Sequence, residues 1–241
     1  FVAMDQIVNQ AAKIHYMFGG QQKFPITFRA AVGGGTKLAA QHSQSPYSMF
    51  MNLAGIKIIL PSTPYDMKGL LKSAIRDDNP VISFEANRLL GFKGEVSDDD
   101  YTVPIGVADV KRDGADITVV AIAWMVHEAL AAAEIMDKEG VSVEVIDPRT
   151  LAPLDAGTIL KSVQKTGRLL VADEAGPTAG ASAEIIALAT EDAETFRALK
   201  VPVRRVCALN APIPYSPVLE DHVFPNRNRI ADGIRTVMSA G

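Results

Sequence analysis

Hydrophobic and polar positions alternate along this chain in two patterns. Short continuous apolar runs rich in Val and Ile predict buried strands, and longer stretches with apolar residues three or four positions apart predict amphipathic helices. The predicted strands are 26–29, 56–60, 81–84, 117–123, 141–146, 169–172 and 203–209. The predicted helices are 2–18, 45–53, 64–76, 125–139, 155–165, one from about 181, and 226–238. Apolar strands separated by helices indicate parallel sheets covered on both faces, which is an α/β fold.

The alternation is interrupted between residues 91 and 115. This stretch holds Gly91, Gly94, an acidic run at 98–100 and Pro104, and it is polar and rich in turn formers. The sequence therefore predicts a first domain at 1–92, a linker at 93–115 and a second domain at 116–241. We interpret the acidic run as a solvated loop face.

The chain begins inside an amphipathic helix pattern, in which Ile7, Ala11 and Ile14 share one stripe. No signal-peptide pattern precedes it. We therefore expect further sequence upstream of residue 1.

Composition excludes several classes of protein. The 241 residues carry a net charge of -4, which gives no electrostatic reason to expect nucleic acid or an anionic membrane as a partner. No apolar run is long enough to span a bilayer. The single cysteine, Cys207, excludes an internal disulfide and lies in an apolar run, where it is expected to be a small buried residue.

His42 is the main candidate for chemistry. It is predicted to lie in a loop between Gly33-Gly34-Gly35 and the helix at 45–53. Histidine exchanges protons near neutral pH, and a loop on a rigid scaffold is a favoured place for such a group. The structural alternative is a solvated or turn-satisfied histidine. The other histidines, which are weaker candidates, are His15, His127 and His222.

The three glycines and Arg29 raise the question of a phosphate site. Glycine lets backbone N–H groups approach an anion. The spaced pattern of a nucleotide-binding loop is absent, however. We favour a turn that positions His42, and we interpret Arg29 as a structural ion-pair partner. No Gly-Asp-Gly occurs in the chain.

Several long segments carry a resemblance to a known family. The chain resembles the beta subunit of the thiamine-diphosphate-dependent dehydrogenase component of 2-oxo acid dehydrogenase complexes, in the transketolase family, and is most similar to the acetoin dehydrogenase branch. The segments that carry the resemblance are 39–45, 55–66, 68–71, 73–82, 16–20, 147–150, 173–175 and 216–221.

The resemblance implies a fold, an activity and partners. The fold would be the C-terminal portion of a transketolase-like pyrimidine-binding domain followed by a transketolase C-terminal domain. The enzyme would cleave acetoin or a 2-oxo acid and transfer the acyl unit to a lipoyl group of a partner acyltransferase. Thiamine diphosphate would be shared with an alpha subunit that carries the magnesium motif, in a heterotetramer. The location would be the bacterial cytoplasm or the mitochondrial matrix.

The resemblance also assigns site residues. His42 would face the thiazolium side of the cofactor as the catalytic residue. The glutamate that contacts the pyrimidine lies upstream of this sequence, so no cofactor-binding residue is assigned here. A structural potassium ion would be bound by Ile26, Ala74, Ile75, Asp77 and Asn79. The residues alone favour an ordinary helix end at 74–80 with Asp and Asn as turn formers, and only the resemblance favours the ion.

Two alternatives stay open at this point. The chain can be the beta subunit of a pyruvate dehydrogenase component. Substrate contacts in this family come from both subunits, so the sequence of one subunit does not decide the substrate. A protein of another class, a non-catalytic assembly subunit, is also compatible with the sequence.

Overall fold

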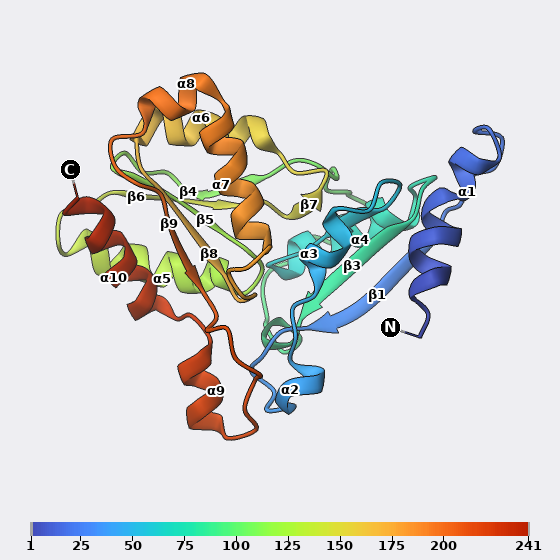
Figure 1. The fold of residues 1–241 in the computed structure, drawn as a ribbon, viewed down its shortest axis with the longest axis horizontal. Coiled ribbons are helices and arrows are strands. Elements are labelled where there is room, and N and C mark those ends of the chain that lie inside the picture. The colour runs from blue at the N-terminus through green and yellow to red at the C-terminus, as the bar shows by residue number, and fades with distance from the viewer. Residues whose placement is uncertain (1, 241) are drawn as a thin grey trace.

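The structure of the protein is a computed structural model that describes residues 2–240. Two twisted sheets lie side by side, with helices packed on their faces (Figure 1). The strands are β1 Thr27–Val32, β2 Lys57–Ile59, β3 Val81–Ala86, β4 Asp109–Arg112, β5 Ile117–Ala121, β6 Val143–Asp147, β7 Thr150–Ala152, β8 Leu169–Asp173 and β9 Arg204–Cys207.

Helices occur in both halves of the chain. They are η1 Gln6–Ala11, α1 Ala12–Met17, α2 Ala39–His42, α3 Tyr47–Met51, α4 Pro64–Ile75, η2 Asn87–Leu89, α5 Met125–Asp137, α6 Ala156–Thr166, α7 Ala181–Glu191, α8 Ala193–Ala198, α9 Pro217–Val223 and α10 Arg227–Met238. The backbone from η1 into α1 is one continuous helix with a π-helical segment. The expected long helix at 2–18 is thus confirmed in outline.

The first sheet has the order β1-β3-β2-β7. β3 pairs in parallel with both β1 and β2, whereas β7 pairs antiparallel with β2. Helix α4 follows β2 and begins as the sequence predicts, because Thr63 Oγ1 accepts a hydrogen bond of 3.1 Å from the N–H of Asp66 and Pro64 occupies the first helical position.

The second sheet has the order β4-β6-β5-β8-β9. Its central strands β5, β6 and β8 are parallel and buried along their whole length, while β4 runs antiparallel at one edge. The α/β class is confirmed. Each sheet also carries an antiparallel edge strand, β7 or β4, that the hydrophobic pattern did not predict.

One hydrophobic core joins the two sheets. Ile58, Ile82 and Phe84 of the first sheet belong to the same buried cluster as Val120 and Val171 of the second. A second cluster packs α5 and α10 on the opposite face of the second sheet. The two halves of the chain are therefore fixed against each other.

A buried ion-pair cluster reinforces this junction. Asp66 at the start of α4 is fully buried, and its two carboxylate oxygens lie 2.8 Å from Lys111 Nζ and 2.7 Å from an Arg149 guanidinium nitrogen. Burial alone would raise the pKa of Asp66, but hydrogen bonds from Lys111 and Thr63 outweigh it, and the pKa lies below its usual value. Nearby, burial raises the pKa of Asp147 to about 6.

Two strands, β4 and β7, do not follow the predicted division into a first domain, a linker and a second domain. β4 lies inside the stretch 93–115, and β7 comes from the later part of the chain but pairs with the first sheet. The predicted linker therefore contains a strand that the hydrophobic pattern did not predict. The reason is that β4 is short, half exposed and charged, and so has no apolar run. The boundaries 1–92, 93–115 and 116–241 stay a prediction.

Candidate active site

His42 lies beyond the carboxyl end of β1, on the short helix α2. It is the last residue of α2, and its side chain is exposed. The sequence predicted a loop at His42, and this prediction was wrong, because the structure has a short helix. A helix of four residues is too short to show a helical period in the sequence. The carboxyl ends of parallel strands are the usual ligand side of an open α/β sheet. Throughout residues 2–240, no hydrogen bond reaches the His42 ring.

The three glycines before His42 are packed against side chains from distant parts of the chain. A Cβ atom on Gly33 would lie 2.1 Å from a Glu174 carboxyl oxygen, and one on Gly34 would lie 2.1 Å from the Phe224 ring. A Cβ atom on Gly35 would lie 2.2 Å from the side chain of Arg88. Glycine is needed at these positions because a Cβ atom would occupy the space of the neighbouring side chains. This packing supports the positioning interpretation of the loop.

The same loop is a poor place for a phosphate group. Its backbone N–H groups at Gly35 and Lys37 already donate to Glu220 Oε1, at 3.2 and 3.3 Å. Glu220 is fully buried, and its other oxygen lies 2.5 Å from Lys37 Nζ. Two acidic side chains, Glu174 and Glu220, thus occupy the space that an anion would need. The glycine loop therefore does not fit the diphosphate of a thiamine cofactor.

A pair of buried acids lies directly beneath the segment that carries His42. Asp173 and Glu174 follow one another at the end of β8, and both are buried. The hydroxyl of the buried Tyr47 donates to Asp173 Oδ1. Burial and the neighbouring Asp173 raise the pKa of Glu174 to about 8, against smaller opposite effects of Arg88 and Ser45. Glu174 is therefore largely protonated at neutral pH.

Sequence reasoning missed the acid pair as a feature of the site. The segment 173–175 served only as one of the segments that carry the family resemblance. The available signal was two consecutive acids at the end of a wholly apolar strand, where a charge cannot be solvated. Glu220, also in a segment used for the resemblance, gave no such signal, because its burial depends on a glycine loop 185 residues away.

A cavity of about 610 Å³ adjoins this acid pair. It lies between the α2 segment and the chain that follows β9, and Ser43, Ser45, Glu174 and Asn210 line part of it. Ser43 is 1% exposed, and its hydroxyl has no hydrogen-bond partner in the part of the chain that the structure describes. The Ser43 hydroxyl thus points inward, whereas the His42 side chain is exposed.

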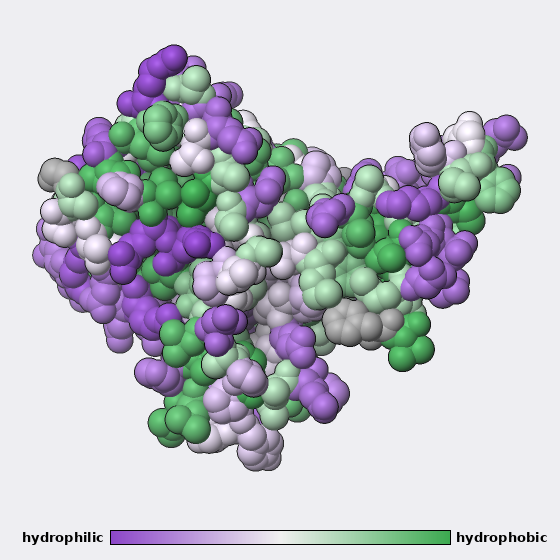
Figure 2. Space-filling view, viewed as in Figure 1, coloured by the Kyte–Doolittle hydropathy of each residue, from purple (hydrophilic) through white to green (hydrophobic). Residues whose placement is uncertain are grey.

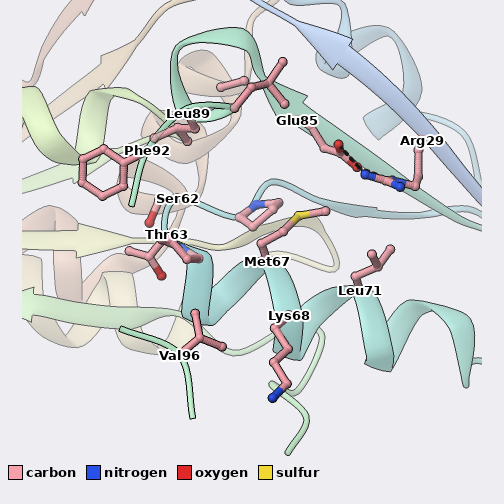
Figure 3. Close-up of a pocket in the computed structure, with 14 residues that line it drawn as sticks. Arg29, Ser62, Thr63, Met67, Lys68, Leu71, Glu85, Leu89, Phe92 and Val96 are labelled. Carbon is pink, nitrogen blue, oxygen red and sulfur yellow. Dashed lines mark hydrogen bonds and ion pairs between the residues drawn. The ribbon is translucent and has the colours of Figure 1, made fainter. Parts of the chain in front are cut away.

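A second cavity, of about 400 Å³, lies at the carboxyl ends of β2 and β3 (Figure 3). Met67 and Leu71 of α4 and Leu89 and Phe92 form much of its wall. Its charged pair is Arg29 and Glu85, joined at 2.6 Å, so the interpretation of Arg29 as an ion-pair partner is confirmed. Because this pair is mutually satisfied, the cavity is a weaker candidate than the His42 region.

The residues assigned to potassium are brought close together. The N–H of Phe24 donates to Asp78 O at 2.9 Å, which places the segment of Ile26 beside the turn at 74–79. The Asp77 carboxylate is already engaged by the Lys57 ammonium and by the backbone and side-chain N–H groups of Asn79. A cation here would depend mainly on main-chain carbonyls, such as those of the α4 end, Ala74 and Ile75.

The remaining histidines have structural roles or none. His15 Nδ1 lies 2.8 Å from Gln22 O, and His127 Nε2 lies 2.8 Å from Ser62 O. His222 is exposed on α9. Cys207 is buried, as expected, and 2–240 contain no group of three or more His, Cys, Asp or Glu side chains that could hold a metal ion. Of the helices in that range, none has the length and apolarity to cross a membrane.

Comparison with known proteins identifies the family. The transketolase pyrimidine-binding domain matches residues 1–93, and the transketolase C-terminal domain matches residues 106–230. The chain belongs to the transketolase family of thiamine-diphosphate-dependent enzymes. A solved structure described as a split-gene transketolase, inactive beta4 tetramer, has a TM-score of 0.80 over 99% of this chain and 72% of its own, at 20% identity, which supports the fold alone.

Within the family, the chain is similar to beta subunits of several dehydrogenases. It is 48% identical to the acetoin:2,6-dichlorophenolindophenol oxidoreductase subunit beta of Cupriavidus necator, over 100% of this chain and 70% of that protein. It is 46% identical to the protein of the same name from Bacillus subtilis, over 94% and 66%. It is 43% identical to the 2-oxoisovalerate dehydrogenase subunit beta of Bacillus subtilis, over 97% and 71%. The chain therefore spans about two thirds of these relatives.

Proposed function

We propose that this chain is the beta subunit of a thiamine-diphosphate-dependent dehydrogenase component that acts on acetoin or a 2-oxo acid. The observation that carries the proposal is the site itself. An exposed histidine is held beyond the carboxyl end of β1 by a loop that is packed from behind and has no room for an anion. Such a site needs groups from outside the described residues to complete it, and we assign those that bind the diphosphate to an alpha subunit.

His42 carries the chemistry assigned to this chain. Its ring is exposed and unconstrained by hydrogen bonds in residues 2–240, so it is free to meet a substrate bound between two chains. A neutral imidazole can take a proton from a substrate hydroxyl, and an imidazolium can donate one to a carbonyl oxygen. When bound, thiamine diphosphate supplies an electron sink for carbon–carbon cleavage.

The proposal includes partners that complete the assembly. An alpha subunit would supply the magnesium and diphosphate site, the two subunits forming a heterotetramer, and a lipoyl-bearing acyltransferase would accept the product. The enzyme would work in the bacterial cytoplasm or in the mitochondrial matrix. The resemblance supports each of these assignments. A structural potassium ion at Ile26, Ala74, Ile75, Asp77 and Asn79 belongs to the same proposal, with carbonyl oxygens as its main ligands.

Activity of the reconstituted pair tests the proposal. The full-length chain is co-expressed with its alpha subunit and supplied with thiamine diphosphate, magnesium and 2,6-dichlorophenolindophenol. We expect reduction of the dye with acetoin, and none with either chain alone. Turnover with pyruvate in place of acetoin would select the pyruvate dehydrogenase alternative. If the purified pair binds cofactor but turns over no substrate, the chain is an assembly subunit.

A further inference from the structure

The backbone that leads to His42 adopts an unfavourable conformation. Gly33 and Gly35 have φ values of +81° and +97°, and the non-glycine residues Lys37 and Ala39 have φ values of +59° and +61°. This left-handed region is disfavoured for residues with a Cβ atom. Such a conformation persists only where surrounding contacts hold it. The segment 33–42 therefore depends on contacts with the rest of the molecule.

Some contacts close the segment on itself. The N–H of Gly33 donates to Gln44 O at 2.9 Å, and Gln44 Nε2 donates to Ala40 O at 3.1 Å. Asn87 Nδ2 donates to Gly33 O at 2.8 Å and so fixes the beginning of the segment. These bonds leave the portion nearest α2, from Gly35 to Ala39, to be held by other groups.

One buried carboxylate holds that portion. Glu220 Oε1 accepts from the N–H groups of Gly35 and Lys37, and Glu220 Oε2 lies 2.5 Å from Lys37 Nζ. Glu220 lies on α9, which approaches α2 at the bottom of Figure 1. A single carboxylate thus accepts two backbone hydrogen bonds and pairs with one ammonium group within the left-handed segment. A carboxylate is well suited to this task, because ionised acceptors make stronger hydrogen bonds than neutral ones.

We propose that Glu220 is a positioning residue, which fixes the place of His42 by holding the backbone of Gly35 and Lys37 from α9. The His42 ring has no hydrogen bond of its own within residues 2–240, so its place is set by the backbone of α2. The catalytic consequence rests on the proposed function of His42. The structural consequence, an ordered His42 segment, does not.

The test compares two variants at Glu220 with one at Lys37, in the full-length chain paired with its alpha subunit. Glu220→Ala removes all three interactions. Glu220→Gln keeps an oxygen acceptor for the two N–H groups, and Lys37→Met removes the ammonium but keeps both N–H groups. Glu139→Gln is the matched control, because Glu139 is a surface glutamate paired with Arg235 on the other side of the second sheet.

Four quantities are measured for each variant. They are kcat and KM with acetoin, hydrogen exchange of the amides from residue 33 to 44, and the NMR signal of the His42 ring. Glu220→Ala is expected to lose exchange protection at Gly35 and Lys37 and to split or broaden the ring signal. Its kcat should fall by about 10- to 100-fold with a much smaller change in KM, as a displaced catalytic group requires. Glu220→Gln and Lys37→Met should be intermediate, and Glu139→Gln should match the wild type.

The results separate positioning from a merely structural role. Loss of stability in Glu220→Ala with a normal ring signal and a normal kcat in the folded fraction would overturn the proposal. If Glu220→Ala does not fold, unchanged exchange, ring signal and kcat in both milder variants would overturn it equally. If the wild-type pair turns over no substrate, the proposed function fails, while exchange and the ring signal still decide whether Glu220 orders the His42 segment.

Discussion

Glu174→Gln is expected to stabilise the protein, and increasingly so as the pH rises. Glutamine has nearly the shape of glutamate, so it keeps the contact with Gly33 and can accept the hydrogen bond from Ser45. It has no proton to lose. The substitution therefore isolates the free energy of holding a carboxyl group in a fully buried place.

The sign follows from the direction of the pKa change. Burial and Asp173 raise the pKa of Glu174 from 4.5 to about 8 in the folded protein. Between these two pH values, the folded state keeps a proton that the unfolded state has lost. The free energy of unfolding of the wild type therefore falls as the pH rises from 4.5 to 8. Glu174→Gln lacks this contribution, so the variant gains on the wild type over the same range.

The magnitude follows from about 1.36 kcal/mol per pKa unit. The difference between variant and wild type should be near zero at pH 4, about 3 kcal/mol at pH 7 and about 5 kcal/mol above pH 8. These values are upper limits, because relaxation and water entry reduce the effect of burial.

Urea denaturation at pH 5, 7 and 9 measures these differences. Glu139→Gln is the control. A hydrogen bond from Arg235 holds the pKa of Glu139 below its usual value, so any contribution of that carboxylate is lost only on the acid side and its curve should run parallel to the wild type from pH 5 to 9. Parallel curves for Glu174→Gln and the wild type would refute the reasoning, because Glu174 would then ionise normally. A variant that becomes less stable than the wild type as the pH rises would show that attraction to Arg88 outweighs burial.

Three further predictions address the catalytic residue, the glycine loop and the cation. His42→Ala should lower turnover of the reconstituted pair by about 10²- to 10⁴-fold without changing thermal stability, whereas His222, which is also exposed, should tolerate alanine. Near-normal turnover of His42→Ala would remove His42 from the mechanism. Gly34→Ala places a Cβ atom 2.1 Å from the Phe224 ring and should lower the free energy of unfolding by about 1–3 kcal/mol in urea denaturation. Gly91→Ala, with no atom within 4 Å of the new Cβ, should be neutral. Equal stability of the two variants would contradict the packing argument. If potassium binds at this turn, the melting temperature of the wild type should rise when potassium replaces a bulky organic cation, following RT ln(1 + [L]/Kd). Asp77→Ala should reduce that rise, because the carbonyl ligands remain, whereas Lys57→Met, which removes the same ion pair, should keep it in full.

Features that depend on local sequence could be predicted, and the observed elements show why. The start of α4 at Thr63 and Pro64 follows from capping chemistry, and the buried strands β5 and β8 follow from continuous apolar runs. The edge strand β4 and the short helix α2 could not be predicted. Their residues are charged or too few, and they are held by contacts with partners distant in sequence.

The site shows the same division. A histidine after a glycine-rich turn is visible in the sequence. The reason for the glycines is not, because Glu174, Phe224 and Glu220 reach the loop from more than 100 residues away. Burial, which gives Glu174 its raised pKa and Glu220 its three donors, is a property of the folded chain. For Glu174 the wholly apolar strand before it indicates burial, whereas for Glu220 the sequence carries no such signal.

The exposed apolar side chains also needed the structure. Val218 and Leu219 on α9 are 77% and 54% exposed, and Figure 2 shows hydrophobic side chains at the same lower end of the molecule. In the sequence these residues lie in a segment with no clear periodicity. Apolar surface of this kind is typical of contacts between chains, which agrees with a site shared between subunits.

The central claim is that this chain supplies only half of a thiamine diphosphate site. Calorimetric titration of the full-length chain with thiamine diphosphate and magnesium, alone and together with its alpha subunit, tests it most directly. The claim predicts no measurable binding to the chain alone, because acidic groups fill its glycine loop, and saturable binding to the pair. Binding by the isolated chain with a micromolar Kd would contradict it.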